Sequence, residues 1–248
     1  MTVKLAITGK GGSGKTTIVK AFMHVIKEMF PDKSILLFDN DLTSELAHSF
    51  GLDIRNTIYG IRSGKHEYKT GIPDDMTKSE FIEWALEDII VSIDENVDII
   101  ESWFVGSKDC RCPITKQIND AVYKLINRYD FVIFDCEFDL KYLYQLVDVE
   151  IDTTLIIANP TEESAHLAQR IKEFSSKHAA GSQLGVVINK VDNSKLPVLS
   201  ELLTKYELDI LGAIPYDSSL DEEHKTDKES KVVQEAIKSF YSRLNLPQ

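Results

Sequence analysis

Short apolar runs alternate with stretches of helical apolar spacing along most of the chain. Apolar runs of about four to eight residues between turn residues predict buried strands. We expect strands at Val3–Thr8, Ser34–Phe38, Val97–Trp103, Phe131–Phe134, Thr153–Ala158, Leu184–Asn189 and Ile210–Ile214. We expect helices at Lys15–Met29, Thr43–Phe50, Lys78–Ser92, Pro113–Asn127, Leu140–Val147, Glu162–Lys177, Lys195–Tyr206 and Lys228–Leu244. This alternation predicts an α/β fold in which helices cover both faces of a mostly parallel sheet.

Local signals refine this pattern at a few places. Thr77-Lys78-Ser79-Glu80 has the spacing of a capping box, which predicts a helix start at Lys78. The stretch Asp53–Asp75 is the least regular, and its glycines and proline predict a long surface loop. The chain shows no repeats and no convincing linker, so we predict one domain over residues 1–248. We interpret the apolar face of the last helix as a covering for the sheet rather than a membrane-targeting surface.

Composition and charge exclude several classes of function. The chain has 248 residues, of which 43% are hydrophobic, and a formal net charge of −12. So acidic a protein is a poor ligand for nucleic acid phosphates and for anionic membranes, and we expect neither as a partner. The sequence starts in a strand-like run without signal-peptide features, and no apolar run has a spanning length, which favours a cytoplasmic protein. In that compartment the three cysteines are thiols, metal ligands or redox groups.

A glycine-rich segment joins the first predicted strand to the first helix. It reads Gly9-Lys10-Gly11-Gly12-Ser13-Gly14-Lys15-Thr16-Thr17, which contains the phosphate-loop pattern G-x-x-x-x-G-K-[ST]. Glycines let backbone N–H groups crowd around an anion, and the helix that follows adds its positive dipole end. We expect Lys15 to reach the β- and γ-phosphates of a nucleotide and the Thr16 hydroxyl to bind Mg²⁺.

Lys10, directly after the first glycine, indicates which class of phosphate-loop proteins the chain resembles. With Lys10 the loop resembles the deviant phosphate loop of the partition, septum-site, nitrogenase iron-protein and metal-maturation ATPases. The resemblance implies a P-loop fold of that family, ATP as nucleotide, Mg²⁺-dependent hydrolysis and a nucleotide-dependent homodimer. It also implies that Lys10 reaches across the dimer to the partner subunit's nucleotide.

Two predicted strands end in aspartates that fit this resemblance. Asp39 and Asp41 form a D-x-D element similar to switch I of the family, in which the first lies near Mg²⁺ and the second positions the attacking water. Leu42-Thr43 follows where the family usually has Pro-Asn. Asp135 closes a second apolar strand as a Walker B aspartate does, near the metal bound by Thr16. The next residues, 136–140, lack the glycine that relatives carry in switch II.

Two later strand ends resemble the purine-contacting segments of the family. Asn189 is predicted to bond the adenine edge, and the backbone near Pro215 to frame the ring. Asn189 could equally cap a helix. Asp192 completes an N-K-x-D pattern, which is also found in guanine-binding proteins, while Lys10 and the family resemblance favour adenine.

The cysteines suggest a metal function. Cys110 and Cys112 form a C-x-C pair, and a two-fold dimer would supply the four sulfurs of a closed site for Ni²⁺ or Zn²⁺. A deviant loop with C-x-C between switch I and Walker B resembles the CooC-type ATPases, which mature nickel carbon monoxide dehydrogenase. The alternative is that both are incidental loop thiols. Cys136 is predicted to be a buried thiol, although it could join an intersubunit iron–sulfur cluster.

Three functions follow from these observations. The first is an ATP-dependent metallochaperone that passes nickel to a client metalloenzyme such as carbon monoxide dehydrogenase. The second is an iron–sulfur ATPase that donates electrons to a partner enzyme. The third is a partition or positioning ATPase, against which the net charge of −12 and the C-x-C pair count.

Overall fold

The computed structural model describes residues 1–41, 43–63, 72–102, 113–136, 150–178, 182–192, 194, 196–220 and 230–247. Within these ranges every strand belongs to one sheet, in the order β3-β4-β2-β5-β1-β6-β7-β8. The strands are β1 Val3–Gly9, β2 Ile35–Asn40, β3 Val91–Asp94, β4 Val97–Glu101, β5 Phe131–Cys136, β6 Thr153–Ala158, β7 Gln183–Val191 and β8 Ile210–Pro215. All neighbours are parallel except β3, which runs antiparallel to β4. The predicted α/β architecture is confirmed.

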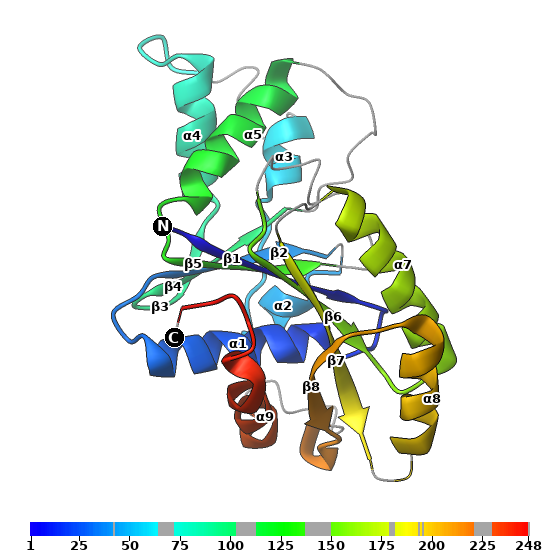
Figure 1. Ribbon diagram of the computed structural model, residues 1–248. Helices are drawn as coiled ribbons and strands as arrows, with labels where there is room; N and C mark the ends of the chain where they lie inside the picture. The colour runs from blue at the N-terminus through cyan, green and yellow to red at the C-terminus, as the bar shows by residue number, and fades with distance from the viewer. Residues whose placement is uncertain are drawn as a thin grey trace.

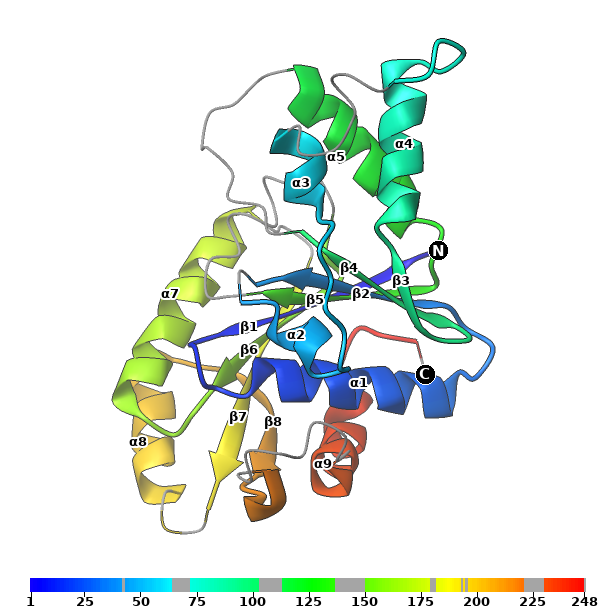
Figure 2. The same cartoon turned by 180° about the vertical axis from the view of Figure 1, so that it is seen from behind.

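Helices lie on both faces of this sheet (Figure 1). The helices are α1 Lys15–Met29, α2 Glu45–His48, α3 Ile58–Ser63, α4 Lys78–Asp88, α5 Pro113–Ile126, α7 Glu162–His178, α8 Leu196–Tyr206 and α9 Lys231–Tyr241, with a short 3₁₀ turn η3 at Ser218–Leu220. Seen from behind, α1 and α9 lie below the sheet, and α3, α4 and α5 lie above it (Figure 2). No described helix has the length and apolar character needed to cross a membrane.

Side chains alternate along each strand between two apolar cores. In β2, Leu36 and Phe38 enter the core shared with α3, α4 and α5, whereas Ile35 and Leu37 enter the core shared with α1 and α9. Since successive strand residues point to opposite faces, Asp39 continues the second series and faces α1. The predicted packing of the last helix against the sheet is confirmed by Ile237 and Phe240 of α9, which lie in that core.

The largest difference from the expected elements lies after α4. The helix predicted to run to Ser92 ends at Asp88, and Val91–Asp94 forms the edge strand β3. The reason is the period-two alternation of Val91, Ser92, Ile93 and Asp94, which alternate between half-buried and exposed positions on the edge of the sheet. The capping box at the start of α4 is confirmed, because the Thr77 and Glu80 side chains each bond the other's backbone N–H.

Smaller differences concern element ends. The helix predicted at Thr43–Phe50 is the single turn α2, and the one predicted at Lys228–Leu244 begins at Lys231, where the Ser230 hydroxyl accepts from the Val233 N–H. The stretch predicted as a long loop contains the six-residue helix α3. The helix predicted at Leu140–Val147 lies outside the described residues.

Candidate nucleotide-binding site

The glycine-rich loop connects β1 to α1 at the middle of the sheet. Gly9, Gly12 and Gly14 have positive φ angles of 153°, 75° and 92°. A Cβ on Gly9 would lie 2.2 Å from the backbone oxygen of Ile157 on the neighbouring strand β6, so a side chain here would push the loop off the sheet. Gly14 is the N-cap of α1 and, in the described structure, no side chain caps this helix end. The first N–H groups of α1 are therefore available to an anion, as the loop pattern predicts.

Asn189 and Lys190, near the end of β7, form hydrogen bonds with backbone carbonyls of the loop. The Asn189 Nδ2 donates to the Ser13 carbonyl over 2.8 Å, and the Lys190 Nζ donates to the Gly12 carbonyl over 3.1 Å. Lys190 has a left-handed backbone with φ 58°, and its own N–H donates to the Asn189 side-chain oxygen at 2.9 Å. Asn189 is thus placed at the site, but as a contact of the loop. Its bond to the adenine edge stays a prediction.

Thr16 and Asp135 connect the loop to the next strand. The Thr16 hydroxyl donates to Asp135 Oδ2 over 3.0 Å, although the two residues are 119 positions apart in the sequence. The pairing of β1 with β5 places Ile7 beside Asp135, which explains why the Walker B position meets the start of α1. The two predicted Mg²⁺ ligands therefore lie in direct contact. Lys15, which precedes Thr16, is also buried.

Asp39 and Asp135 lie side by side at the carboxyl ends of β2 and β5. They are register partners in the sheet, and both are fully buried. Burial raises the pKa of Asp39 to about 8, with a further rise from the Asp135 charge. Burial also raises the pKa of Asp135 to about 7, against the lowering effect of Lys15 and of the Thr16 hydrogen bond. Lys15 and the Thr16 hydrogen bond thus offset only part of the effect that burial has on Asp135.

Two oxygens of this pair fit a metal ion. Among the residues that the structure describes, neither Asp39 Oδ2 nor Asp135 Oδ1 has a hydrogen-bond partner, and both atoms are buried. Unpartnered buried carboxylate oxygens are costly, and hard cations such as Mg²⁺ take oxygen ligands. Thr16, Asp39 and Asp135 therefore fit the predicted Mg²⁺ position.

Asp41 lies in a turn held by side-chain hydrogen bonds. Its N–H donates to Asp39 Oδ1 at 2.9 Å, and its own Oδ1 accepts from the N–H and the hydroxyl of Thr43 at 2.9 and 2.8 Å. Asp41 is 5% exposed. Thr43, one of the two residues that depart from the family pattern, thus orients this carboxylate.

Lys10 pairs with an acidic residue of its own chain. Its Nζ lies 2.6 Å from Glu163 Oε2 in the first turn of α7, and both side chains are largely exposed. Pro215 lies at the exposed end of β8, where it is paired with Val191 of β7. The two segments predicted to contact the base therefore end at the same edge of the sheet as the loop.

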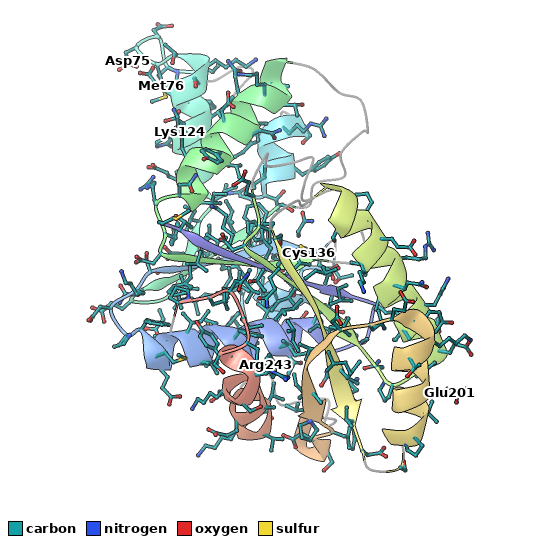
Figure 3. All side chains as sticks on the ribbon, in the orientation of Figure 1. Asp75, Met76, Lys124, Cys136, Glu201 and Arg243 are labelled. Carbon is teal, nitrogen blue, oxygen red and sulfur yellow. The ribbon has the colours of Figure 1, made fainter. Side chains whose placement is uncertain are left out.

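The cysteines divide into two groups. Cys110 and Cys112 lie outside the described residues, so their metal site stays a prediction. Cys136 ends β5, and Figure 3 shows it in the middle of the molecule. It is 1% exposed, and burial raises the pKa of its thiol well above the ordinary value. The predicted burial of Cys136 is confirmed within the described chain, and its part in an intersubunit iron–sulfur cluster stays a prediction.

Comparisons with known proteins agree with this geometry. The family model described as the CobQ/CobB/MinD/ParA nucleotide binding domain matches residues 4–230. An uncharacterized ATP-binding protein of Methanocaldococcus jannaschii is 26% identical over 225 residues, which cover 88% of this chain and 86% of the relative. The carbon monoxide dehydrogenase accessory protein CooC of Rhodospirillum rubrum is 21% identical over 240 residues, covering 88% and 85%. The septum site-determining protein MinD of Pyrococcus horikoshii, solved with Mg-ADP, superposes with a TM-score of 0.66 at 22% identity over 98% of this chain and 96% of that one.

Proposed function

Because the chain belongs to the CobQ/CobB/MinD/ParA nucleotide-binding family, we propose that it is a Mg²⁺-dependent ATP hydrolase that acts as a nucleotide-controlled switch. The observation that carries the proposal is the 3.0 Å contact between the Thr16 hydroxyl and Asp135, which brings the phosphate loop and the Walker B strand together. The choice of ATP is supported by the name of the archaeal relative.

We assign roles to the residues of the site from their positions and from the family's chemistry. The N–H groups of the loop and Lys15 bind the β- and γ-phosphates. Thr16, Asp39 and Asp135 hold Mg²⁺, which neutralises phosphate charge when bound. Asp41, fixed by Thr43, orients the attacking water. Asn189 and Lys190 keep the Ser13 and Gly12 carbonyls turned away from the phosphates, so that the loop presents its N–H groups.

Lys10 provides the link to a second copy of the chain. In the described chain its ammonium is held by Glu163, an exposed pair of the kind that contributes little stability. We expect ATP to favour a dimer in which Lys10 leaves Glu163 and binds the partner subunit's nucleotide. The driving force is the greater negative charge of the triphosphate compared with one carboxylate.

We consider two cellular functions that such a nucleotide-controlled switch would serve. Positioning of a partner protein is supported by the family and by the fold likeness to MinD. Delivery of Ni²⁺ or Zn²⁺ to a client metalloenzyme is supported by Cys110 and Cys112 and by the CooC relative. The two candidates share the ATPase and differ in whether a metal is carried between two subunits.

Nucleotide binding is tested by titrating a fluorescent ATP analogue with and without Mg²⁺. We expect tight binding only with Mg²⁺, and Mg²⁺-independent or absent binding would refute the proposal. Metal analysis of protein purified without oxygen, in ADP and in a non-hydrolysable ATP analogue, then separates the outputs. One divalent ion per dimer, lost in a Cys110→Ser/Cys112→Ser variant and kept in Cys136→Ser, supports metal delivery. Absence of metal supports positioning, and about four irons per dimer would support the redox alternative.

A further inference from the structure

Tyr216 lies at the carboxyl end of β8, next to the end of β7. It follows Pro215, the register partner of Val191, and its N–H donates to the Val191 carbonyl at 3.0 Å. Val191 comes two residues after Asn189, whose side-chain amide donates to the Ser13 carbonyl of the phosphate loop. A short series of contacts therefore connects Tyr216 with the loop, although the two are far apart in the sequence.

Tyr216 and Asn189 also belong to the same face of the sheet. Val187 of β7 and Ile214 of β8 both lie in the core that the sheet shares with α1 and α9. Successive residues of a strand point to opposite faces, so Asn189 and Tyr216, each two residues further on, continue these two series. Alternation therefore places the Tyr216 side chain on the side of the sheet where Asn189 meets the loop and α1 begins.

The backbone around Tyr216 is fixed on both sides. The next residue, Asp217, accepts at Oδ2 from the Ser230 hydroxyl over 2.7 Å, and that hydroxyl accepts from the Val233 N–H at the start of α9. On the other side, the ring of Pro215 restricts its φ angle. A ligand that contacts the Tyr216 side chain would thus meet a residue whose backbone is already in place, which lowers the entropic cost of binding.

An aromatic side chain at this place can supply what the loop and Asn189 do not. Tyr216 is 48% exposed, so much of its surface is accessible to a ligand. The loop is suited to bind phosphates, and the Asn189 amide is predicted to bond the edge of a base. The flat face of a base is bound best by an aromatic ring, because every base presents a π-face for stacking.

We propose that Tyr216 is a base-binding residue whose ring stacks on the purine of the bound nucleotide. The inference rests on the proposed Mg²⁺-dependent nucleotide binding, and it adds a contact that the phosphates do not make. Stacking uses the face of the base and leaves its edge to polar groups such as Asn189. Tyr216 therefore increases the affinity for a nucleotide without affecting how the loop binds a phosphate chain.

The test compares Tyr216→Ala and Tyr216→Phe with wild type and with Tyr123→Ala, a matched change at a similarly exposed tyrosine of α5. Isothermal titration calorimetry measures the dissociation constants of Mg-ATP and of inorganic tripolyphosphate, which has no base. We expect Tyr216→Ala to weaken Mg-ATP about 10-fold and to leave tripolyphosphate within about twofold of wild type. Tyr216→Phe, which keeps the ring, and Tyr123→Ala should leave both affinities unchanged.

A second measurement follows the stacking contact directly. Tyr216→Trp keeps an aromatic ring and adds a fluorophore at this position. Compared with wild type, its emission should change when Mg-ATP is added and should stay constant when tripolyphosphate is added. An emission that responds equally to both ligands would indicate a movement of the segment rather than contact with a base.

Two results would overturn the inference. One is an unchanged Mg-ATP affinity in Tyr216→Ala. The other is an equal loss of affinity for Mg-ATP and tripolyphosphate, because such a loss would indicate a distorted loop. If wild-type protein binds no Mg-ATP, the proposed function itself fails, whereas wild-type binding with no effect of Tyr216→Ala removes only the role of Tyr216.

Discussion

Aspartates at the two ends of strands β2 and β5 lie in opposite environments. At their amino ends, Asp130 accepts from Lys33 Nζ at 2.9 Å and from the N–H and hydroxyl of Ser34 at 3.1 Å. These hydrogen bonds, led by that from Lys33, lower the pKa of Asp130. At the carboxyl ends, Asp39 and Asp135 are buried, and their pKa values are raised to about 8 and 7.

This contrast distinguishes carboxylates that stabilise the fold from carboxylates that are suited to bind a ligand. A carboxylate with donors around it stabilises the fold, because its charged form is favoured in the native state. A buried carboxylate with an oxygen left without a partner destabilises the fold until a cation arrives. Substitutions at the carboxyl ends of the strands, here called the carboxyl edge, should therefore affect nucleotide binding and hydrolysis. Substitutions at the amino ends, here called the amino edge, should affect only the stability of the fold.

The largest expected effect is on the rate of hydrolysis. Asp41→Ala removes the carboxylate that Thr43 orients, and we expect turnover to fall by about 10²–10⁴-fold while ATP still binds. Single-turnover phosphate release measures the rate, and a fluorescent ATP analogue measures binding. Wild-type turnover in this variant would refute the role assigned to Asp41.

The next effect is on nucleotide affinity. Lys15→Ala removes the buried charge that meets the phosphates, and we expect the dissociation constant for Mg-ATP to rise at least about 100-fold. The control is Lys33→Ala at the amino edge, where the lysine pairs with Asp130 and nucleotide affinity should be unchanged. Equal losses in the two variants would remove the distinction between the two edges.

A third prediction concerns the amino edge alone. Asp130→Asn should lower the free energy of unfolding by about 1 kcal/mol at pH 7 and leave Mg-ATP affinity unchanged. Because the pKa of Asp130 is lowered in the folded state, its contribution is present above the unfolded pKa of the carboxyl. It disappears as pH falls through the folded pKa, so the two proteins should become equally stable in acid. Urea unfolding at a series of pH values measures this difference, and one that persists in acid would contradict the ionic cause.

The smallest expected effect is on dimerisation and involves the exposed ion pair between Lys10 and Glu163. Lys10→Ala should weaken ATP-dependent dimerisation, whereas Glu163→Gln, which frees Lys10, should strengthen it by about two- to fivefold. Light scattering with ADP and with a non-hydrolysable ATP analogue reports both changes. One mass that does not depend on nucleotide would refute the action of Lys10 across the dimer.

Much of the site could be predicted because its residues follow strands in a local pattern. The phosphate loop, Asp39 and Asp135 each come at the end of an apolar run, and parallel strands bring such ends together. The role of Thr43 at Asp41 is not predictable in this way, because it depends on side-chain hydrogen bonds within a turn after the strand. The available signal is an aspartate followed two residues later by a threonine, since Asp side chains often bond the backbone two residues on.

Contacts between distant segments were also beyond the sequence pattern. Nothing local indicates that Lys190 takes a left-handed backbone and returns its side chain to Gly12. The sequence pattern predicts a helix through Ser92, the second residue of the edge strand β3, because the apolar residues of α4 and β3 follow one another without a glycine or proline between them. The alternation in Val91–Asp94 is the signal that separates them.

Strand β3 also affects whether a strand of another molecule can pair with this edge of the sheet. An open sheet edge can recruit a foreign strand and begin aggregation. Here the edge is only four residues long, its register shifts between Ser92 and Asp94, and Asp94 forms an ion pair with Lys27 of α1. A short, irregular and charged edge is a poor template for further strands. At β3, the native fold therefore opposes the addition of further strands that would extend the sheet into a fibre.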